Sequence, residues 1–356
     1  MVIGLKMNQK IKLKESVYIL KESEEIYQVV FTSTRRIKRF SVDHLVKELI
    51  FSAKSETNMQ EVISKLGTKY PEEDIVTCLY SLEAAGIVNF YGDDKINPRH
   101  KRQISFINEL TENWEETMKL QKRLEESRIA VFGIGGIGTW MVNGLNQIGI
   151  GEIRIIDPDI VSISNLNRQL FFNESDLGQY KVDVISQKLS DANIKKYYDT
   201  VSRDQPLDKI VENCNFLVNC ADFPSVADTT KIIDEYATRY NIPYSVAGGY
   251  NMHLGMVGPI IVPGKTACFD CFLAYQKEND PLSNLEKIKD VEQTGSLGPI
   301  AGAIANFQVM EIFKYITGKG SVNINRFVEI DFMDFNIEWR EYSKKPDCIT
   351  CNLQAK

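Results

Sequence analysis

The sequence lacks a long hydrophobic run. None of its apolar stretches approaches the roughly 20 residues that a membrane-spanning helix needs. The N-terminus carries lysines but no continuous apolar segment with a small-residue cleavage site, so we expect no signal peptide. An excess of positive charge is also missing, because 42 Lys and Arg face 48 Asp and Glu. The chain is therefore not expected to bind nucleic acid or a membrane, and we expect it to be cytoplasmic.

The cysteines do not form an even set. There are seven, and four of them form two CxxC pairs, Cys268 with Cys271 and Cys348 with Cys351. This pattern favours a reducing compartment and a metal over a disulfide framework. Four thiolates suit a closed, structural Zn²⁺ site that would fasten the C-terminal tail to the domain, with a redox CxxC as the alternative. The remaining cysteines lie in apolar stretches and are expected in the core: Cys78, Cys214 and Cys220.

A length of 356 residues suits about two domains. Residues 10–40 alternate as in a small antiparallel sheet, residues 42–50, 59–66 and 71–85 have helical periodicity, and residues 87–91 form a short strand. The order predicts a small α+β winged helix-turn-helix domain over residues 1–95. Such a domain binds DNA, for which the chain offers Arg35, Arg36, Lys38 and Arg39, or holds a peptide as an added strand, or serves only for packing or dimerisation.

A glycine-rich turn follows the apolar run RIAVF at residues 128–132. The turn reads GIGGIG, and a helical pattern comes after it. A strand, glycine turn and helix of this kind open an α/β nucleotide-binding domain, in which backbone N–H groups approach a phosphate. The four glycines are Gly133, Gly135, Gly136 and Gly138. We expect a Rossmann-like domain with a central, mostly parallel sheet over residues 96–356.

Polar and charged residues follow the next strand pattern, residues 153–157. Asp157 ends that pattern, where an acid binds ribose hydroxyls. The residues expected beside it are Asp159, Asn165, Arg168, Gln169 and Lys181. Arg168 and Lys181 would neutralise charge that moves onto pyrophosphate. An NAD-dependent oxidoreductase does not need these cations, whereas an enzyme in which a carboxylate attacks the α-phosphate of ATP does.

Asp222 follows another apolar strand pattern, residues 216–222. Open α/β sheets place their chemistry at the carboxyl ends of their strands, and a carboxylate there suits Mg²⁺ on a triphosphate. The alternative is that Asp222 caps the following helix.

Four strings in this order, GIGGIG, DPDIVSISNLNRQ, LGQYK and CAD, resemble the ubiquitin-activating superfamily with its ThiF- and MoeB-type adenylyltransferases. The resemblance covers roughly residues 96–356. It implies that Asp157 binds the ribose, that Asn165, Arg168 and Lys181 bind the phosphates of ATP, and that Asp222 binds Mg²⁺. Arg102, within RHKRQ at residues 99–103, matches an arginine finger that reaches the ATP of the partner subunit. A homodimer with composite sites is implied.

Two further segments, VAGGY at 246–250 and VGPIIVPGKTAC at 257–268, resemble the members of this superfamily that modify ribosomally made precursor peptides, of the microcin C and pantocin A type. That resemblance implies a leader-peptide clamp in residues 1–95 and adenylation of a peptide carboxylate in antibiotic biosynthesis. The outcome stays open between C-terminal Asn nucleotidylation and Glu activation with cyclisation. The alternatives are activation of a ubiquitin-like sulfur-carrier protein, a DNA-binding regulator and an NAD-dependent oxidoreductase.

Thioester-forming members carry a further cysteine in a crossover segment. Residues 273–299 contain none, so transfer through a cysteine thioester is not expected. This segment and the loop at residues 249–253 are expected to contact the peptide. His253 in that loop is one of only three histidines and is a candidate acid–base group, the alternative being an incidental loop residue.

Overall fold

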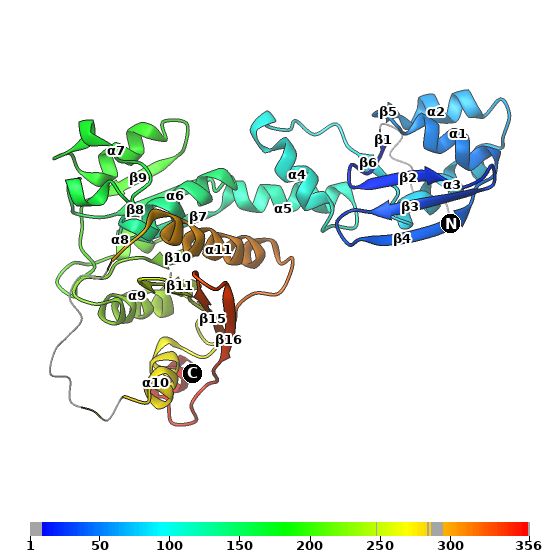
Figure 1. Cartoon of the computed structure of the whole chain (residues 1–356). Coiled ribbons are helices and arrows are strands. Elements are labelled where there is room, and N and C mark those ends of the chain that lie inside the picture. Colours follow the sequence, from blue (N-terminus) through cyan, green and yellow to red (C-terminus); the bar gives the residue numbers. More distant parts are fainter. Residues whose placement is uncertain (1–8, 247, 283–284, 286–294, 355–356) are drawn as a thin grey trace. The chain divides into compact units, whose positions relative to one another are not determined.

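The computed structural model describes residues 9–246, 248–282, 285 and 295–354. The chain divides into two compact units, residues 1–122 and 123–356, and each is described by itself. Figure 1 shows the order of the elements along the chain.

The part of the first unit up to residue 91 contains two small antiparallel sheets and the helices α1, α2 and α3. One sheet has the order β2-β3-β4 and the other the order β5-β1-β6. Their bounds are β1 Lys10–Leu13, β2 Val17–Lys21, β3 Ile26–Phe31, β4 Arg36–Ser41, β5 Thr57–Asn58 and β6 Val88–Tyr91. The helices are α1 His44–Ser52, α2 Met59–Leu66 and α3 Glu72–Ala84. The elements lie where the periodicity of the sequence predicts them, around one apolar core that includes Ile11, Val29, Leu49 and Leu79.

Local signals set the starts of these helices. The Asp43 side chain accepts from the N–H of Val46 at 2.8 Å and so caps α1. The helix α3 begins after Pro71 with three acids in its first turn, where a negative charge favours the helix dipole.

The first unit extends past residue 95, into a polar and charged stretch whose sequence predicts one helix, over residues 110–124. The unit contains α4 (Lys101–Asn108), which was not predicted, and the beginning of α5 (Trp114–Glu126), which lies where that helix was predicted. The indole N–H of Trp114 donates to Asp94 at 2.7 Å, and its ring lies 4.9 Å from that of Tyr91. A large aromatic side chain thus ties α5 to the strand that ends the small domain.

The second unit is an α/β domain built on a six-stranded sheet with the order β14-β11-β10-β7-β8-β9. All neighbours are parallel except β14, which makes the sheet mixed and mostly parallel, as predicted. Its strands are β7 Arg128–Phe132, β8 Glu152–Ile156, β9 Ile194–Tyr197, β10 Phe216–Asn219, β11 Tyr244–Val246 and β14 Ile260–Ile261. The strands β7, β8 and β10 are almost entirely buried, so they read as apolar runs without alternation.

Helices alternate with the strands of this sheet along the chain and cover it. The helices that follow the first strands are α6 Gly136–Gln147, α7 Lys181–Lys188, α8 Asp208–Val211 and α9 Val226–Tyr240. The order of the strands reverses at β7, which has β8 on one side and β10 on the other. Open sheets bind their ligands at the carboxyl ends of the strands at such a switch point.

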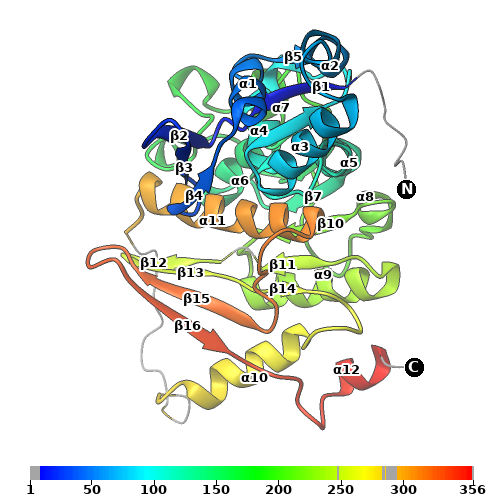
Figure 2. The same cartoon turned by 90° about the vertical axis from the view of Figure 1, so that its right-hand side faces the viewer.

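A second, antiparallel sheet completes the unit, with the order β12-β13-β15-β16. Figure 2 shows these strands side by side next to α11. The elements are β12 Tyr250–Asn251, β13 Leu254–Val257, α10 Phe269–Asn279, α11 Gly298–Thr317, β15 Arg326–Asp331, β16 Asn336–Glu341 and α12 Ile349–Gln354. One face of the sheet packs on α11 through Val257, Ile304, Val328 and Ile330. Of the helices described, none combines the length and the hydropathy that a membrane crossing requires.

Candidate functional site

The glycine turn is fixed by close backbone packing. Gly133 has a φ of +85°, and a Cβ on it would lie 2.6 Å from the backbone nitrogen of Ala221. A Cβ on Gly138 would lie only 2.0 Å from the carbonyl oxygen of Gly133. A Cβ on Gly135, in contrast, would meet no described atom within 4 Å. Two glycines are therefore required by packing, whereas Gly135 borders open space at the start of α6.

Asp157 connects the glycine turn to the loop after β8. One carboxylate oxygen accepts from the N–H of Ile134 at 2.6 Å, and the other accepts from the N–H of Asp159 at 2.8 Å. Burial raises the pKa of Asp157, and the nearby Lys181 and the two backbone N–H groups act against that rise. Each oxygen keeps a further acceptor position, so both can also accept from a hydroxyl group.

Lys181 begins α7 and is buried beside two acids. Its ammonium lies 2.7 Å from the carboxylate of Asp159 and 3.6 Å from that of Asp157. The backbone N–H of Lys181 donates to the carbonyl oxygen of Asp159 at 3.0 Å. Lys181 is thus a buried cation next to Asp157, the acid that accepts a hydrogen bond from the glycine turn.

The side chain of Arg168 packs against the first turn of α6. A Cβ on Gly136 would lie 3.4 Å from Cδ of Arg168. The guanidinium donates to the carbonyl oxygen of Ser164 at 2.7 Å and to the Asn167 side chain at 3.1 Å. The loop that carries it is ordered by Asn165, whose side chain accepts from the N–H of Ser162 at 2.9 Å.

Gln169 is buried, and its side-chain oxygen has no hydrogen-bond partner among the described residues. A buried amide oxygen without a donor is costly in a folded chain. It is the kind of group that a bound molecule would satisfy.

Asp222 lies three residues beyond the end of β10, in a loop, and is exposed. Its neighbour Ala221 is the residue that a Cβ on Gly133 would strike, so this loop packs directly on the glycine turn. The cap of the following helix α9 is Ser225, which accepts from the N–H of Asp228 at 3.1 Å. The carboxylate of Asp222 is therefore not engaged as that helix cap.

Two aromatic residues belong to this region and were not predicted as site residues. The indole N–H of Trp140, in α6, donates to the carbonyl oxygen of Arg168 at 3.1 Å. The hydroxyl of Tyr250 pairs with that of Ser296, and a Cβ on Gly136 would lie 3.3 Å from it. In the sequence, Trp140 belongs to an apolar helical stripe, which indicates a core residue. The one feature that could have pointed to the site is the indole N–H, which needs a hydrogen-bond acceptor when it is buried.

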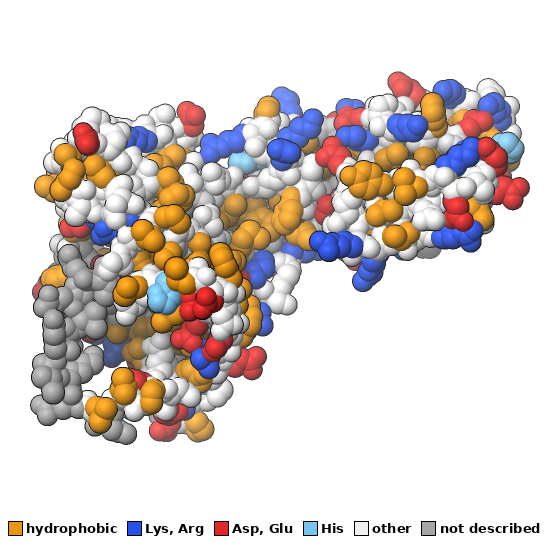
Figure 3. All heavy atoms as spheres, viewed as in Figure 1, with side chains coloured by type: hydrophobic (Ala, Val, Ile, Leu, Met, Phe, Trp, Pro, Cys, Tyr) orange, Lys and Arg blue, Asp and Glu red, His pale blue; other side chains and the backbone are white. Residues whose placement is uncertain are grey.

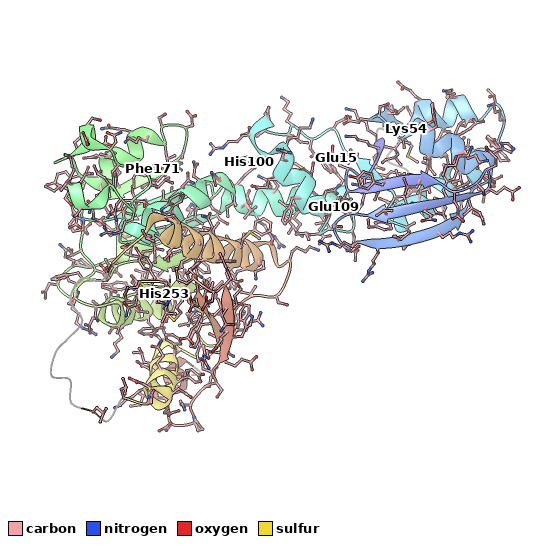
Figure 4. All side chains as sticks on the ribbon, in the orientation of Figure 1. Glu15, Lys54, His100, Glu109, Phe171 and His253 are labelled. Atoms are coloured by element: carbon pink, nitrogen blue, oxygen red, sulfur yellow. The ribbon has the colours of Figure 1, made fainter. Side chains whose placement is uncertain are left out.

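Two further candidate residues lie on other elements. Arg102 is exposed on α4 in the first unit, so its reach toward any nucleotide stays a prediction. His253 lies in the turn between β12 and β13 and is labelled in Figure 4, with its Nε2 3.9 Å from a carboxylate oxygen of Asp331. Much of the crossover segment, residues 283–284 and 286–294, lies outside the described residues, and its peptide contacts also stay a prediction.

The two CxxC pairs come together at the ends of two helices. Cys268 and Cys271 lie at the start of α10, and Cys348 and Cys351 at the start of α12. The four sulfur atoms lie within 4.8 Å of one another, with Cys268 3.4 Å from Cys348 and Cys271 3.7 Å from Cys351. Four thiolates at about 2.3 Å around a tetrahedral Zn²⁺ are roughly 3.8 Å apart. The cluster fits a closed zinc site in which all four ligands are cysteine sulfurs.

Comparison with known proteins agrees with this geometry. Residues 100–351 match the ThiF family. The SAMP-activating enzyme E1 of Haloferax volcanii is 28% identical over 240 residues, which cover 65% of this chain and 82% of that protein. The molybdopterin-synthase adenylyltransferase of Escherichia coli is 24% identical over 234 residues, 65% of this chain and 89% of that protein. The adenylyltransferase and sulfurtransferase MOCS3 of Caenorhabditis briggsae is 26% identical, and the match spans only 56% of its length.

Solved structures share the fold over nearly the whole chain. E. coli MccB with ATP has a TM-score of 0.69 at 21% identity, covering 96% of this chain and 99% of MccB. The microcin C7 biosynthetic enzyme MccB with N-formylated MccA gives a TM-score of 0.70 at 22% identity and the same coverage. PaaA covers 79% of this chain and 95% of its own, with a TM-score of 0.62 and 23% identity. The family match spans well over half of the sequence, and the chain belongs to the ThiF family.

Proposed function

We propose that this protein adenylates a carboxylate of a ribosomally made precursor peptide with MgATP. The observation that carries the proposal is the convergence of Lys181, Arg168 and the Asp222 loop on one glycine turn at the switch point of the sheet. Two cations and an acid around a phosphate-binding turn suit a reaction in which charge moves onto pyrophosphate. A hydride-transfer enzyme has no use for that arrangement.

The residues present fit an adenine nucleotide with its phosphates over the turn. Gly135 borders open space, and Gly136 faces Arg168 and Tyr250, so backbone N–H groups at the start of α6 are accessible to an anion. The orphaned oxygen of Gln169 offers an acceptor to a donor group on the ligand. We assign the glycine turn, Asp159, Asn165 and Gln169 to nucleotide binding, and Asp157 to the ribose hydroxyls.

The chemical roles follow from charge. Mg²⁺, held by Asp222, would screen the triphosphate as the peptide carboxylate attacks the α-phosphate. Arg168 and Lys181 stabilise the departing pyrophosphate. Arg102 of the second subunit of a homodimer supplies a third cation, and Zn²⁺ at the four cysteines fastens α12 to α10.

The first unit supports a peptide rather than a folded protein substrate. The strand β4 is an edge of its sheet, since it pairs only with β3, and an extended peptide can add to a free edge. Its exposed Arg36 and Lys38 favour an acidic partner strand. A clamped leader makes the second encounter intramolecular and raises the local concentration of the carboxylate.

A second candidate is activation of a ubiquitin-like sulfur-carrier protein. The relatives matched in sequence include the molybdopterin-synthase adenylyltransferase, whose match covers 65% of this chain. Both candidates share the adenylation step, so they differ only in the carboxylate that is presented.

Pyrophosphate exchange with ATP tests the proposal. We expect exchange to depend on a precursor peptide encoded beside the gene and not on a carrier protein ending in Gly-Gly. Asp222→Asn should abolish the exchange, whereas the exposed Asp204→Asn serves as the matched control and should leave it unchanged. Exchange with the carrier alone would assign the second candidate, and no exchange with either would refute both. Mass spectrometry of the peptide then distinguishes a gain of AMP from a loss of water.

A further inference from the structure

A pocket of about 520 Å³ lies on the antiparallel sheet of the second unit. It extends over β12, β13, β15 and β16, on the sheet face that carries the side chains of Leu254, Met256, Glu329 and Asp331. The opposite face of the same sheet packs on α11, so the pocket is separate from that core. Its volume is in the range of pockets that bind small molecules or short peptide segments.

The charged residues that line the pocket are all acidic. They are Glu329, Asp331 and Glu338. Arg340 contacts two of them, Glu329 at 2.9 Å and Glu338 at 2.5 Å. Asp331 accepts from the N–H of Met333 at 2.9 Å, and among the described residues its one cationic candidate is His253, at 3.9 Å. Three carboxylates against one guanidinium leave the pocket with negative charge.

The remaining lining combines apolar and neutral polar residues. Leu254 and Met256 are its apolar side chains on this face, and Asn251 and Asn336 also line the pocket. Exposed apolar side chains also occupy the turns at its end, where Met252, Met333 and Phe335 are more than half exposed. Figure 3 shows hydrophobic and acidic side chains next to His253 in this part of the surface. An apolar floor with a negative rim matches a long aliphatic side chain that ends in a positive charge.

We propose that this pocket binds a basic side chain, arginine or lysine, of the peptide substrate and so selects peptides for the adenylation site. The inference rests on the proposed function. The aliphatic stem contacts Leu254 and Met256, and the cationic end pairs with Asp331 and Glu338. Tyr250 is a lining residue of the pocket through β12, while its side chain lies on the α11 face of the sheet, and its hydroxyl lies 3.3 Å from the place of a Cβ on Gly136. The strand β12 thus borders the pocket on one face and the glycine turn on the other.

The test measures binding without chemistry. Fluorescein-labelled synthetic peptides of one length carry a single arginine at each position in turn within a neutral sequence, and a matched set carries citrulline instead. Anisotropy with the full-length protein at low salt gives the ratio of the two dissociation constants. The wild type should favour the arginine peptide, at the best position, by about fivefold or more.

Variants of the rim make the result specific to the pocket. Asp331→Asn and Glu338→Gln should each lower the arginine preference by about two- to fivefold, since each removes one partly exposed charge. Arg340→Gln should raise the preference, because it removes the only guanidinium that neutralises the rim. Glu341→Gln is the matched control, as its side chain alternates to the other face of β16 and should leave the ratio unchanged.

Equal or undetectable binding of the two wild-type peptide sets would overturn the inference, and so would an arginine preference that Asp331→Asn and Glu338→Gln both leave unchanged. Such a failure is separate from that of the proposed function. If a precursor peptide supports pyrophosphate exchange while no arginine preference exists, only the pocket is refuted. If the preference exists but no peptide supports exchange, the pocket stands and the adenylation of a peptide is refuted.

Discussion

Gly135 offers the sharpest test of the nucleotide site, because a methyl group there would enter the ligand's space and touch nothing else. Its φ of −89° lies outside the left-handed region, and a Cβ on it would meet no described atom within 4 Å. We expect Gly135→Ala to fold. Gly135 is the N-cap of α6, and alanine is a poorer N-cap than glycine. The substitution should therefore lower the free energy of unfolding by about 1 kcal/mol and Tm by roughly 2–4 °C in a unit of this size.

The effect on ATP should be much larger. Phosphate oxygens approach the N–H groups of the turn to about 3 Å, and a methyl group at Gly135 prevents that approach. Losing one charge-assisted hydrogen bond costs about 1.5–3 kcal/mol, or roughly 10- to 100-fold in affinity. Gly133→Ala is the contrasting variant. With a φ of +85° and a Cβ 2.6 Å from Ala221, it should lose several kcal/mol of stability from strain and overpacking together.

Thermal unfolding followed by circular dichroism measures the stability of both variants, and calorimetric titration with a non-hydrolysable ATP analogue measures affinity. The reasoning requires the two effects to separate, with lost affinity and kept stability for Gly135→Ala and lost stability for Gly133→Ala. A folded Gly135→Ala protein with wild-type affinity would refute the placement of the phosphates over this turn.

Three further predictions concern a buried acid, the cysteine cluster and the subunit arrangement. Burial raises the pKa of Asp234 from 3.8 to about 6, so its protonated form favours the fold, and about 3 kcal/mol present at low pH is lost as the pH rises through 6. About half of that loss, roughly 1.4 kcal/mol, falls between pH 5 and pH 8. Asp234→Asn, which can still accept from Tyr244, should remove this difference in urea unfolding at the two pH values, and an unchanged pH dependence would contradict this assignment. Cys271→Ser should lower the zinc content, measured by metal analysis, and also Tm. A zinc-free wild-type protein with the same Tm as the zinc-loaded protein would disprove the structural role. Mixing Arg102→Ala with Asp222→Ala subunits should restore part of the pyrophosphate exchange if the finger acts in trans, and the absence of any rescue in proven heterodimers would argue against it.

The turn and the cysteine cluster were predictable because short-range chemistry dictates them. A Cβ on residue 133 would lie 2.6 Å from the backbone nitrogen of Ala221, so this position admits only glycine, and GIGGIG supplies one there. Two CxxC pairs bring two thiolates each onto one helix start, so only the meeting of the pairs depends on the fold. The helices of the first unit were likewise signalled by periodicity and by caps such as Asp43.

Other features depend on contacts between distant parts of the chain. The bond from Trp140 to the carbonyl oxygen of Arg168 joins residues 28 positions apart, and no local pattern announces it. The alternative role of Asp222 as a helix cap could be dismissed only when Ser225 was seen in that position. The acidic pocket arises because alternate residues of β15 and β16 share one face of a sheet, and sequence alone does not give the register of that pairing.

The arrangement around Lys181 explains how one lysine can serve the protein with and without a nucleotide. Its ammonium is buried, and a buried charge needs a partner at all times. Asp157 cannot move, since both of its oxygens accept from the backbone. The side chain of Asp159 is 64% exposed and can turn toward solvent at little cost. Asp159 therefore neutralises Lys181 in the free protein, and we expect bound phosphates, which carry more negative charge, to displace it as the partner of Lys181.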